Sequence, residues 1–326
     1  MVCGCRDGNS DVLLFYKGML HLRSAFFIPL LISIRITTIH LTLMILNYIH
    51  WNVDPHLFNV LGISLRYYGL LFVGGLVLCI YILRWIFSNE NIPQASLEKL
   101  SLYGIVGIFV GARLAHCLFY EPSYYLSHPL EIILPIQPTA DGGYKFAGYQ
   151  GLASHGGTLG LIVALVFYAQ KTGESILKTI DLLAVVAPLG ACFIRLANLM
   201  NSEIVGIPTN IPWAFIFERV DSLPRHPAQL YEAIAYLLIF GLMLYLYKSK
   251  REKFKNGFFF GLVITLIFMA RFFIEFIKEK QVPFEEQMKF DMGQLLSIPF
   301  IVIGIGFIIY GLIKTKKDKR STQGMV

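Results

Sequence analysis

The sequence predicts an all-α polytopic membrane protein with seven transmembrane helices, and its composition is the first reason. The chain has 326 residues, of which 56% are hydrophobic and only 15% charged, and its mean hydropathy is +0.61. A water-soluble shell cannot cover that much apolar surface. Because apolar segments recur from residue 67 to the end without a long polar linker, we expect a single membrane domain.

The length of the apolar segments is the second reason. A helix needs about 20 predominantly apolar residues to cross a bilayer. Seven segments approach this length, at residues 67–87, 97–120, 154–171, 176–200, 227–247, 257–278 and 292–313. The third is short and begins with His155-Gly156-Gly157, so it could start as a helix that dips in from the surface.

Lysine and arginine residues in the short loops predict the orientation. Five of them, Lys248, Lys250, Arg251, Lys253 and Lys255, fill one loop, and five more lie in the tail 314–326. An odd number of spans places this loop and the tail on the same side, which we predict to be the cytoplasm. The formal charge of +7 is then mainly a topology signal that also attracts anionic lipid, and it implies no nucleic-acid partner.

The N-terminal residues 1–46 are interpreted as an extension. The apolar stretches within 12–46 are broken by charged residues and form no clean span or signal peptide. Met44 is the expected biological start in preference to Met1, and an interfacial amphipathic helix is the alternative.

The remaining chain is predicted to form a seven-span domain at 47–313, followed by a basic cytoplasmic tail at 314–326. Two long outer loops, 121–153 and 201–226, are rich in Tyr and Pro. We expect the first to form an interfacial arm and the second a small head domain. Loops of this kind on a rigid helical scaffold commonly carry recognition.

The five cysteines indicate neither a disulfide framework nor a metal site. Cys79, Cys117 and Cys192 lie singly in apolar runs, as small buried hydrophobes do. Cys3 and Cys5 lack a second pair of ligands. We therefore expect no metal and no cofactor.

Three arginines inside apolar segments, Arg113, Arg195 and Arg271, give the strongest indication of function. A guanidinium at bilayer depth is costly unless it pairs, lines a polar cavity or meets a substrate. At 1.5 Å per residue, each lies about 10 Å below the outer end of its predicted helix, near the level of phospholipid phosphate. The sequence thus predicts an anion-binding site within the membrane.

Helical spacing places further polar residues beside Arg195. Asn198 and Asn201 follow at intervals of three, so they share a face that runs outward to Glu203. The alternative is that the two asparagines only join helices through hydrogen bonds.

Other polar residues have simpler explanations. Glu275, four residues after Arg271, could merely neutralise it. Asp181 lies near Lys178, and we expect the two to form a structural pair remote from the arginines.

Tyr68 and His155 are predicted at the outer ends of the first and third spans, facing the same compartment. The glycines after His155 leave its imidazole accessible, which makes it a candidate base. A lone histidine is nevertheless more often a packing or hydrogen-bonding residue. His226, beside Pro227, has a weaker claim.

Several motifs resemble those of the bacterial prolipoprotein diacylglyceryl transferases. The longest is RLANLMNSEIVG at 195–206, supported by HGG at 155–157, LRYYG at 65–69, RHPAQLYE at 225–232 and RFFIEF at 271–276. They follow the expected order from about residue 50 to 313. The chain departs from the family at Ile194, Leu199 and Ile267-Phe268, where Gly, Phe and Tyr-Gly are usual.

The resemblance implies a transferase of the bacterial cytoplasmic (inner) membrane with its active site toward the periplasm. Such an enzyme moves the diacylglyceryl group of phosphatidylglycerol onto the lipobox cysteine of a preprolipoprotein during lipoprotein biosynthesis and releases glycerol phosphate. The arm and head would then be periplasmic and the C-terminus cytoplasmic. By motif, the resemblance assigns importance to Tyr68, His155, Arg195, Asn198, Glu203, Gly206 and Arg271.

This chemistry is compatible with the residues themselves. A thiol with a pKa of about 8.5 must become a thiolate to attack, and a departing phosphate needs fixed donors. We expect His155, Tyr68 and Arg271 to be catalytic, with His155 as the base. The residues expected to bind substrate are Arg195, Asn198, Asn201, Glu203, Gly206, Arg113 and Tyr231.

Two other classes of protein would also keep arginines in the membrane. A transporter for an anionic solute should show internal repeats with matching broken helices, and the sequence has none. An intramembrane hydrolase would need a nucleophile paired with His155, but the adjacent Ser154 would point away from it on a helix.

Overall fold

The computed structural model describes residues 48–60, 63–134, 136–139, 143–146, 151, 153–280, 288 and 290–323. The expected extension 1–46 and the start at Met44 lie outside these residues. The described residues divide into two compact units: one contains the residues up to Asn52 together with Ile207–His226, and the other contains the rest.

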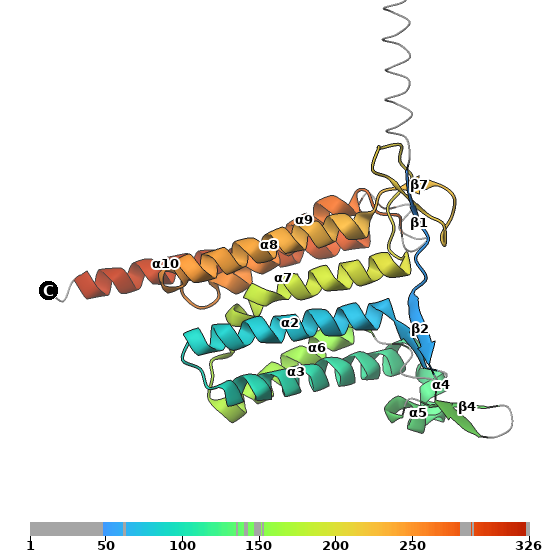
Figure 1. The fold of residues 1–326 in the computed structure, drawn as a ribbon. Helices are drawn as coiled ribbons and strands as arrows, with labels where there is room; N and C mark the ends of the chain where they lie inside the picture. Colours follow the sequence, from blue (N-terminus) through green and yellow to red (C-terminus); the bar gives the residue numbers. More distant parts are fainter. Residues whose placement is uncertain are drawn as a thin grey trace, which may run out of the picture. The chain divides into compact units, whose positions relative to one another are not determined.

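The larger unit is built on seven long helices among the described residues, which lie side by side in Figure 1. They are α2 (Tyr67–Asn89), α3 (Gln94–Ala115), α6 (Ser154–Thr172), α7 (Ile176–Asn201), α8 (Ala228–Lys250), α9 (Phe258–Glu275) and α10 (Met292–Gln323). A π-helix, η1 (His116–Tyr120), continues α3, and a 3-10 turn, η2 (Arg251–Lys253), continues α8.

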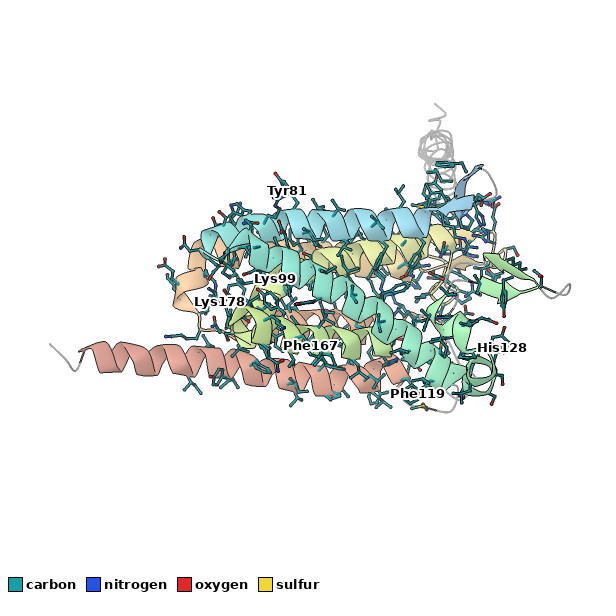
Figure 2. The ribbon with its side chains drawn as sticks, turned by 90° about the horizontal axis from the view of Figure 1, so that it is seen from below. Tyr81, Lys99, Phe119, His128, Phe167 and Lys178 are labelled. Carbon is teal, nitrogen blue, oxygen red and sulfur yellow. The ribbon has the colours of Figure 1, made fainter. Side chains whose placement is uncertain are left out.

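Six of the described helices, all except α6 in this set, are long and apolar enough to cross a membrane. Large side chains such as Tyr81 and Phe167 are exposed, and Figure 2 shows Tyr81 projecting from the bundle, as expected of a surface that faces lipid. The helix α6 has 19 residues with polar side chains at both ends, which lower its average hydropathy. The prediction of a helical multi-pass membrane protein is confirmed, whereas the seventh span stays a prediction.

Facing glycines bring α3 and α6 into close contact. A Cβ atom on Gly160 would lie 1.9 Å from the carbonyl oxygen of Gly107, and one on Gly111 would lie 2.3 Å from that of Gly156. Glycines four residues apart on both helices let backbones approach in the absence of a hydrophobic driving force. This packing joins α6 to the bundle.

A buried core lies among α2, α7, α8 and α9, with Phe87, Val185, Met243 and Phe259 fully enclosed. Its packing aligns the C-terminal end of α7 with the beginning of α8. These two helix ends carry most of the candidate site.

The expected pair between Asp181 and Lys178 is wrong. Asp181 accepts hydrogen bonds from the backbone N–H groups of Gly257 and Phe260, both at 2.8 Å. It therefore caps the first turn of α9, whose N–H groups have no partner within the helix. Lys178 instead lies 3.3 Å from a carboxylate oxygen of Glu90.

The loop after α3 corresponds to the expected arm. It contains α4 (Pro122–Ser127), α5 (Pro129–Ile133) and an antiparallel hairpin of β4 (Ile136–Pro138) and β5 (Tyr144–Phe146). A second hairpin, β2 (His56–Val60) and β3 (Ile63–Arg66), leads into α2. Figure 1 shows α4, α5 and β4 at the end of the bundle where α3 finishes, and Figure 2 shows His128 of the arm near Phe119 at that end.

The smaller unit contains a three-stranded sheet in the order β1-β6-β7. The strands are β1 (Ile49–Trp51), parallel to β6 (Phe215–Phe217), and β7 (Pro224–Arg225), antiparallel to β6. Hydrogen bonds from Arg225 lower the pKa of Asp221 below its ordinary value. This unit takes residues 207–226 of the expected head, while 201–206 belong to the larger unit.

Candidate active site

Arg195 lies six residues before the end of α7 and contacts side chains from two helices. Its Nη1 donates to Oδ1 of Asn198 at 3.0 Å, and its Nε forms an ion pair with Oε2 of Glu232 in α8. The Glu232 side chain is fully buried. A buried carboxylate that pairs with the guanidinium holds Arg195 in one orientation.

A strained turn after α7 directs Glu203 back toward the helix. Ser202 and Ile204 have φ angles of 55° and 59°, which a β-branched residue such as Ile204 rarely adopts. Oε1 of Glu203 accepts hydrogen bonds from Asn198 at 2.7 Å and Asn201 at 3.3 Å. The polar face predicted from helical spacing is therefore a continuous hydrogen-bonded row.

Neighbouring segments fasten this turn. The side chain of Gln229, fully buried at the start of α8, donates to the carbonyl oxygen of Glu203 at 2.6 Å. Gly206 pairs with Lys278 through an isolated antiparallel bridge, and the N–H of Glu279 donates to the carbonyl of Val205 at 3.1 Å. The position of Glu203 is thus determined by two segments that are distant from it in sequence, the start of α8 and residues 278–279.

Lys278 adds a second cation to the network. Its Nζ lies 2.8 Å from Oε1 of Glu232 and 3.0 Å from Oε2 of Glu275, and the residue is buried. Glu232 therefore bridges Arg195 and Lys278. Glu275, considered from the sequence as a partner of Arg271, pairs with Lys278.

Two tyrosines and Arg271 complete the group. Tyr236 of α8 hydrogen-bonds Arg195 and interacts electrostatically with Arg271. Tyr68, in the first turn of α2, interacts electrostatically with Arg195 and Glu203. The fold therefore gathers Tyr68, Arg195 and Arg271, which the sequence singled out separately, around residues of α8 that it did not single out.

Arg113 belongs to a different set of contacts. Its guanidinium donates to the backbone carbonyls of Glu131, Ile132 and Gly151, and it lies 4.8 Å from the centre of the Tyr125 ring. These partners come from the arm and the segment that precedes α6. Arg113 thus fastens the arm to α3, and its expected contact with substrate stays a prediction.

His155 is the second residue of α6 and is exposed. A short link, 173–175, joins α6 to α7, so the beginning of α6 and the end of α7 lie at the same end of the bundle. Within the described part of the chain, no hydrogen bond or ion pair joins His155 to the Arg195 network. Tyr231, also predicted to contact substrate, is half-buried in the first turn of α8.

Sequence reasoning did not identify Gln229, Glu232, Tyr236 or Lys278 as site residues. Glu232 carried a usable signal, because a carboxylate inside an apolar span is as unfavourable as an arginine there. Lys278 follows α9 and carried no comparable signal. In the ranges that the structure describes, no group of His, Cys, Asp and Glu side chains is arranged to hold a metal ion.

Comparison with known proteins agrees with the motifs. Residues 55–310 match the family model described as prolipoprotein diacylglyceryl transferase. A protein from Bacteroides fragilis named phosphatidylglycerol–prolipoprotein diacylglyceryl transferase is 54% identical over 270 residues, which cover 82% of this chain and 98% of that protein. Proteins of the same name from Tolumonas auensis and Chloroherpeton thalassium are 44% and 41% identical; the matches cover 83% and 84% of this chain and 99% and 98% of those proteins.

Proposed function

The chain belongs to the prolipoprotein diacylglyceryl transferase family, and we propose that the Arg195 network is the place where it performs the transfer. The protein is a transferase that moves the diacylglyceryl group of phosphatidylglycerol to a prolipoprotein. The observation that carries the proposal is a guanidinium paired with a fully buried carboxylate inside a membrane bundle. Membership of a transferase family favours this function over the two alternatives considered from the sequence, a transporter for an anionic solute and an intramembrane hydrolase.

The reaction has two chemical requirements. The lipobox cysteine sulfur attacks the glyceryl carbon that carries the phosphate ester, so a C–S bond forms while the C–O bond breaks and glycerol phosphate leaves. The thiol proton must pass to a base, because the thiolate is the nucleophile. The growing negative charge on the departing phosphate must meet donors that are already in place.

Arg195 is suited to the second requirement. A guanidinium has five N–H donors in a rigid fork, more than its contacts with Asn198, Glu232 and Tyr236 use. Its remaining donors can bind phosphate bidentately without reorienting. We assign Arg271 to the same leaving group, since both arginines interact with Tyr236.

His155 is suited to the first requirement. Its exposed ring at the outer start of α6 is accessible to a peptide thiol, so we assign it the role of base. Tyr68 would hold the lipid headgroup or the peptide near the cysteine. Asn198, Asn201 and Glu203 would position the phosphate ligands, and Gly206, Tyr231 and Arg113 would contact the substrates.

The same proposal includes a topology. We assign α6 as the seventh span, with Tyr68, His155 and the end of α7 toward the periplasm. The arm and head would meet preprolipoprotein there, and the tail 314–326 would be cytoplasmic. The cations of the loop 248–255 support this orientation.

Mass spectrometry of a lipobox peptide tests the activity. Incubation of the purified chain with phosphatidylglycerol should add the mass of a diacylglyceryl group to the cysteine. A peptide with serine in place of that cysteine should stay unmodified. The cysteine peptide should also stay unmodified when phosphatidylcholine replaces phosphatidylglycerol. Release of fatty acid or glycerol phosphate without peptide modification would favour a hydrolase and contradict the proposal.

A further inference from the structure

A polar cavity opens at the opposite end of the bundle from the Arg195 network. Its volume is about 730 Å³, and its wall consists of Trp85, residues 89–91 at the end of α2, and residues 247–254, which run from the last turn of α8 through η2. Glu232 lies 18 residues before Lys250 on α8, which corresponds to about 27 Å along the helix. The cavity is therefore separate from the candidate active site.

Cations outnumber carboxylates on the wall of this cavity. The cations are Lys248, Lys250, Arg251 and Lys253, and the carboxylates are Glu90 and Glu252. Glu90 is already engaged, since its two oxygens lie 3.0 Å from Nε of Arg251 and 3.3 Å from Nζ of Lys178. The three lysines of the wall thus produce an excess of positive charge that favours an anion.

The aromatic part of the wall indicates that this anion is a lipid headgroup. Nζ of Lys248 lies 5.1 Å from the centre of the Trp85 ring. The Trp85 ring packs edge-on against the Tyr247 ring, with the two ring centres 5.7 Å apart. Tryptophan favours the boundary between lipid and water, and lysines at helix ends extend toward the same level. A cavity lined by Trp85 and these lysines is therefore expected at the level of the phosphodiester groups of the lipids.

We propose that this cavity binds the headgroup of an anionic phospholipid from the adjacent leaflet. Lys248, Lys250 and Lys253 would surround the phosphodiester, and Trp85 would contact the glycerol backbone of the lipid. A bound lipid of this kind would link the end of α2 to the turn between α8 and α9. The site goes beyond the transfer reaction, because it uses none of the residues assigned to it.

Fluorescence of Trp85 provides the test. The chain has three tryptophans, so the full-length variant Trp51→Phe/Trp213→Phe keeps Trp85 as the sole reporter. The purified variant is titrated in nonionic detergent with short-chain phosphatidylserine, which avoids the substrate lipid. We expect a saturable change in Trp85 emission, and a much weaker change with short-chain phosphatidylcholine or inorganic phosphate.

Lysine variants locate the response. Lys250→Gln/Lys253→Gln, which leaves Lys248 over the indole, should weaken the apparent affinity roughly 10- to 30-fold, about fivefold per lysine. The matched control Lys99→Gln/Lys171→Gln removes two exposed cations outside this cavity and should bind normally. Both double variants should retain transfer to a lipobox peptide, which reports that they are folded.

Three outcomes would overturn the inference. Equal responses to phosphatidylserine and inorganic phosphate would identify a site for a soluble anion. Equal responses to phosphatidylserine and phosphatidylcholine would remove the role of charge, and an unchanged affinity in Lys250→Gln/Lys253→Gln would remove the role of this wall. Because transfer is measured separately, failure of the lipid site is distinguishable from failure of the proposed function.

Discussion

Arg195 and Glu232 meet across α7 and α8, and the second carboxylate oxygen of Glu232 lies 2.8 Å from Nζ of Lys278. One fully buried carboxylate thus holds two cations from different segments. Removal of one partner from such a group leaves an uncompensated buried charge, which is strongly unfavourable. The arrangement keeps the Arg195 fork in place before any substrate arrives, and pre-positioned donors are the ones that stabilise developing charge.

Replacement of Arg195 by lysine should separate charge from geometry. An ammonium is a point charge that cannot bind phosphate bidentately while it also contacts Asn198 and Glu232. We expect the Arg195→Lys protein to insert and fold, with the barrier to transfer higher by about 2 to 4 kcal/mol. The measurement is the rate of diacylglyceryl transfer at matched membrane levels, with Arg84→Lys, an exposed position in α2, as control. A near-normal transfer rate in Arg195→Lys would contradict phosphate binding by Arg195 and indicate that the residue has only a structural role.

His155→Gln tests the assignment of the base. The variant should fold but transfer slowly at neutral pH, because the lipobox thiol, with a pKa of about 8.5, is mostly protonated there. Raising the pH should partly restore the rate by supplying thiolate without a base, and Arg195→Lys should gain little from the same change. Rates measured from neutral to alkaline pH for both variants check this, and an equal gain in both would contradict the division of roles.

Glu232→Gln should destabilise the protein more than an ordinary surface change. It leaves Arg195 and Lys278 without their shared carboxylate, for which we expect a loss of about 3 to 5 kcal/mol. Adding Lys278→Met removes one of the two cations, so the double variant should lose less than the sum of the single variants. Thermal unfolding in detergent measures these differences, with the exposed Glu98→Gln in α3 as control. Strict additivity would mean that Glu232 and Lys278 do not act as a unit.

Gly160→Ala tests the contact between α3 and α6. The added methyl would lie 1.9 Å from the carbonyl oxygen of Gly107, so the helices must separate, at about 1 to 3 kcal/mol. Because His155 is on α6, transfer should fall as well. Gly74→Ala is the matched control, since its methyl would meet nothing within 4 Å. Thermal unfolding and transfer rates equal to those of the control would show that the close approach is not needed.

Thiol labelling in intact cells tests the topology. In a background without the native cysteines, single cysteines at Tyr144 and Thr209 should react with a membrane-impermeant reagent from outside. Cysteines at Lys253 and Lys317 should react only after the inner membrane is permeabilised, because lysine- and arginine-rich loops stay in the cytoplasm. A tail labelled from outside would invert the orientation and remove the candidate site from the periplasmic side.

Much of the candidate site could be predicted from local sequence. Asn198 and Asn201 share a face with Arg195 because three-residue intervals on a helix bring side chains together. The hydrogen bonds from both asparagines to Glu203 bear out that face. The exact path of the chain after α7 could not be predicted, since it depends on left-handed backbone at Ser202 and Ile204, which those residue types do not favour.

The sequence by itself determined the class of the protein, the approximate position of each apolar helix and the family motifs, because composition and helical periodicity are local properties. Only the tertiary structure decided which partner each buried charge has: Arg195 with Glu232, Lys278 with Glu232 and Glu275, Arg113 with the arm, and Asp181 with the first turn of α9. These pairings depend on which helices pack against one another and at what depth. Spacing along one helix holds no information about that packing, whereas the high free energy of an uncompensated charge in the membrane makes some partner obligatory.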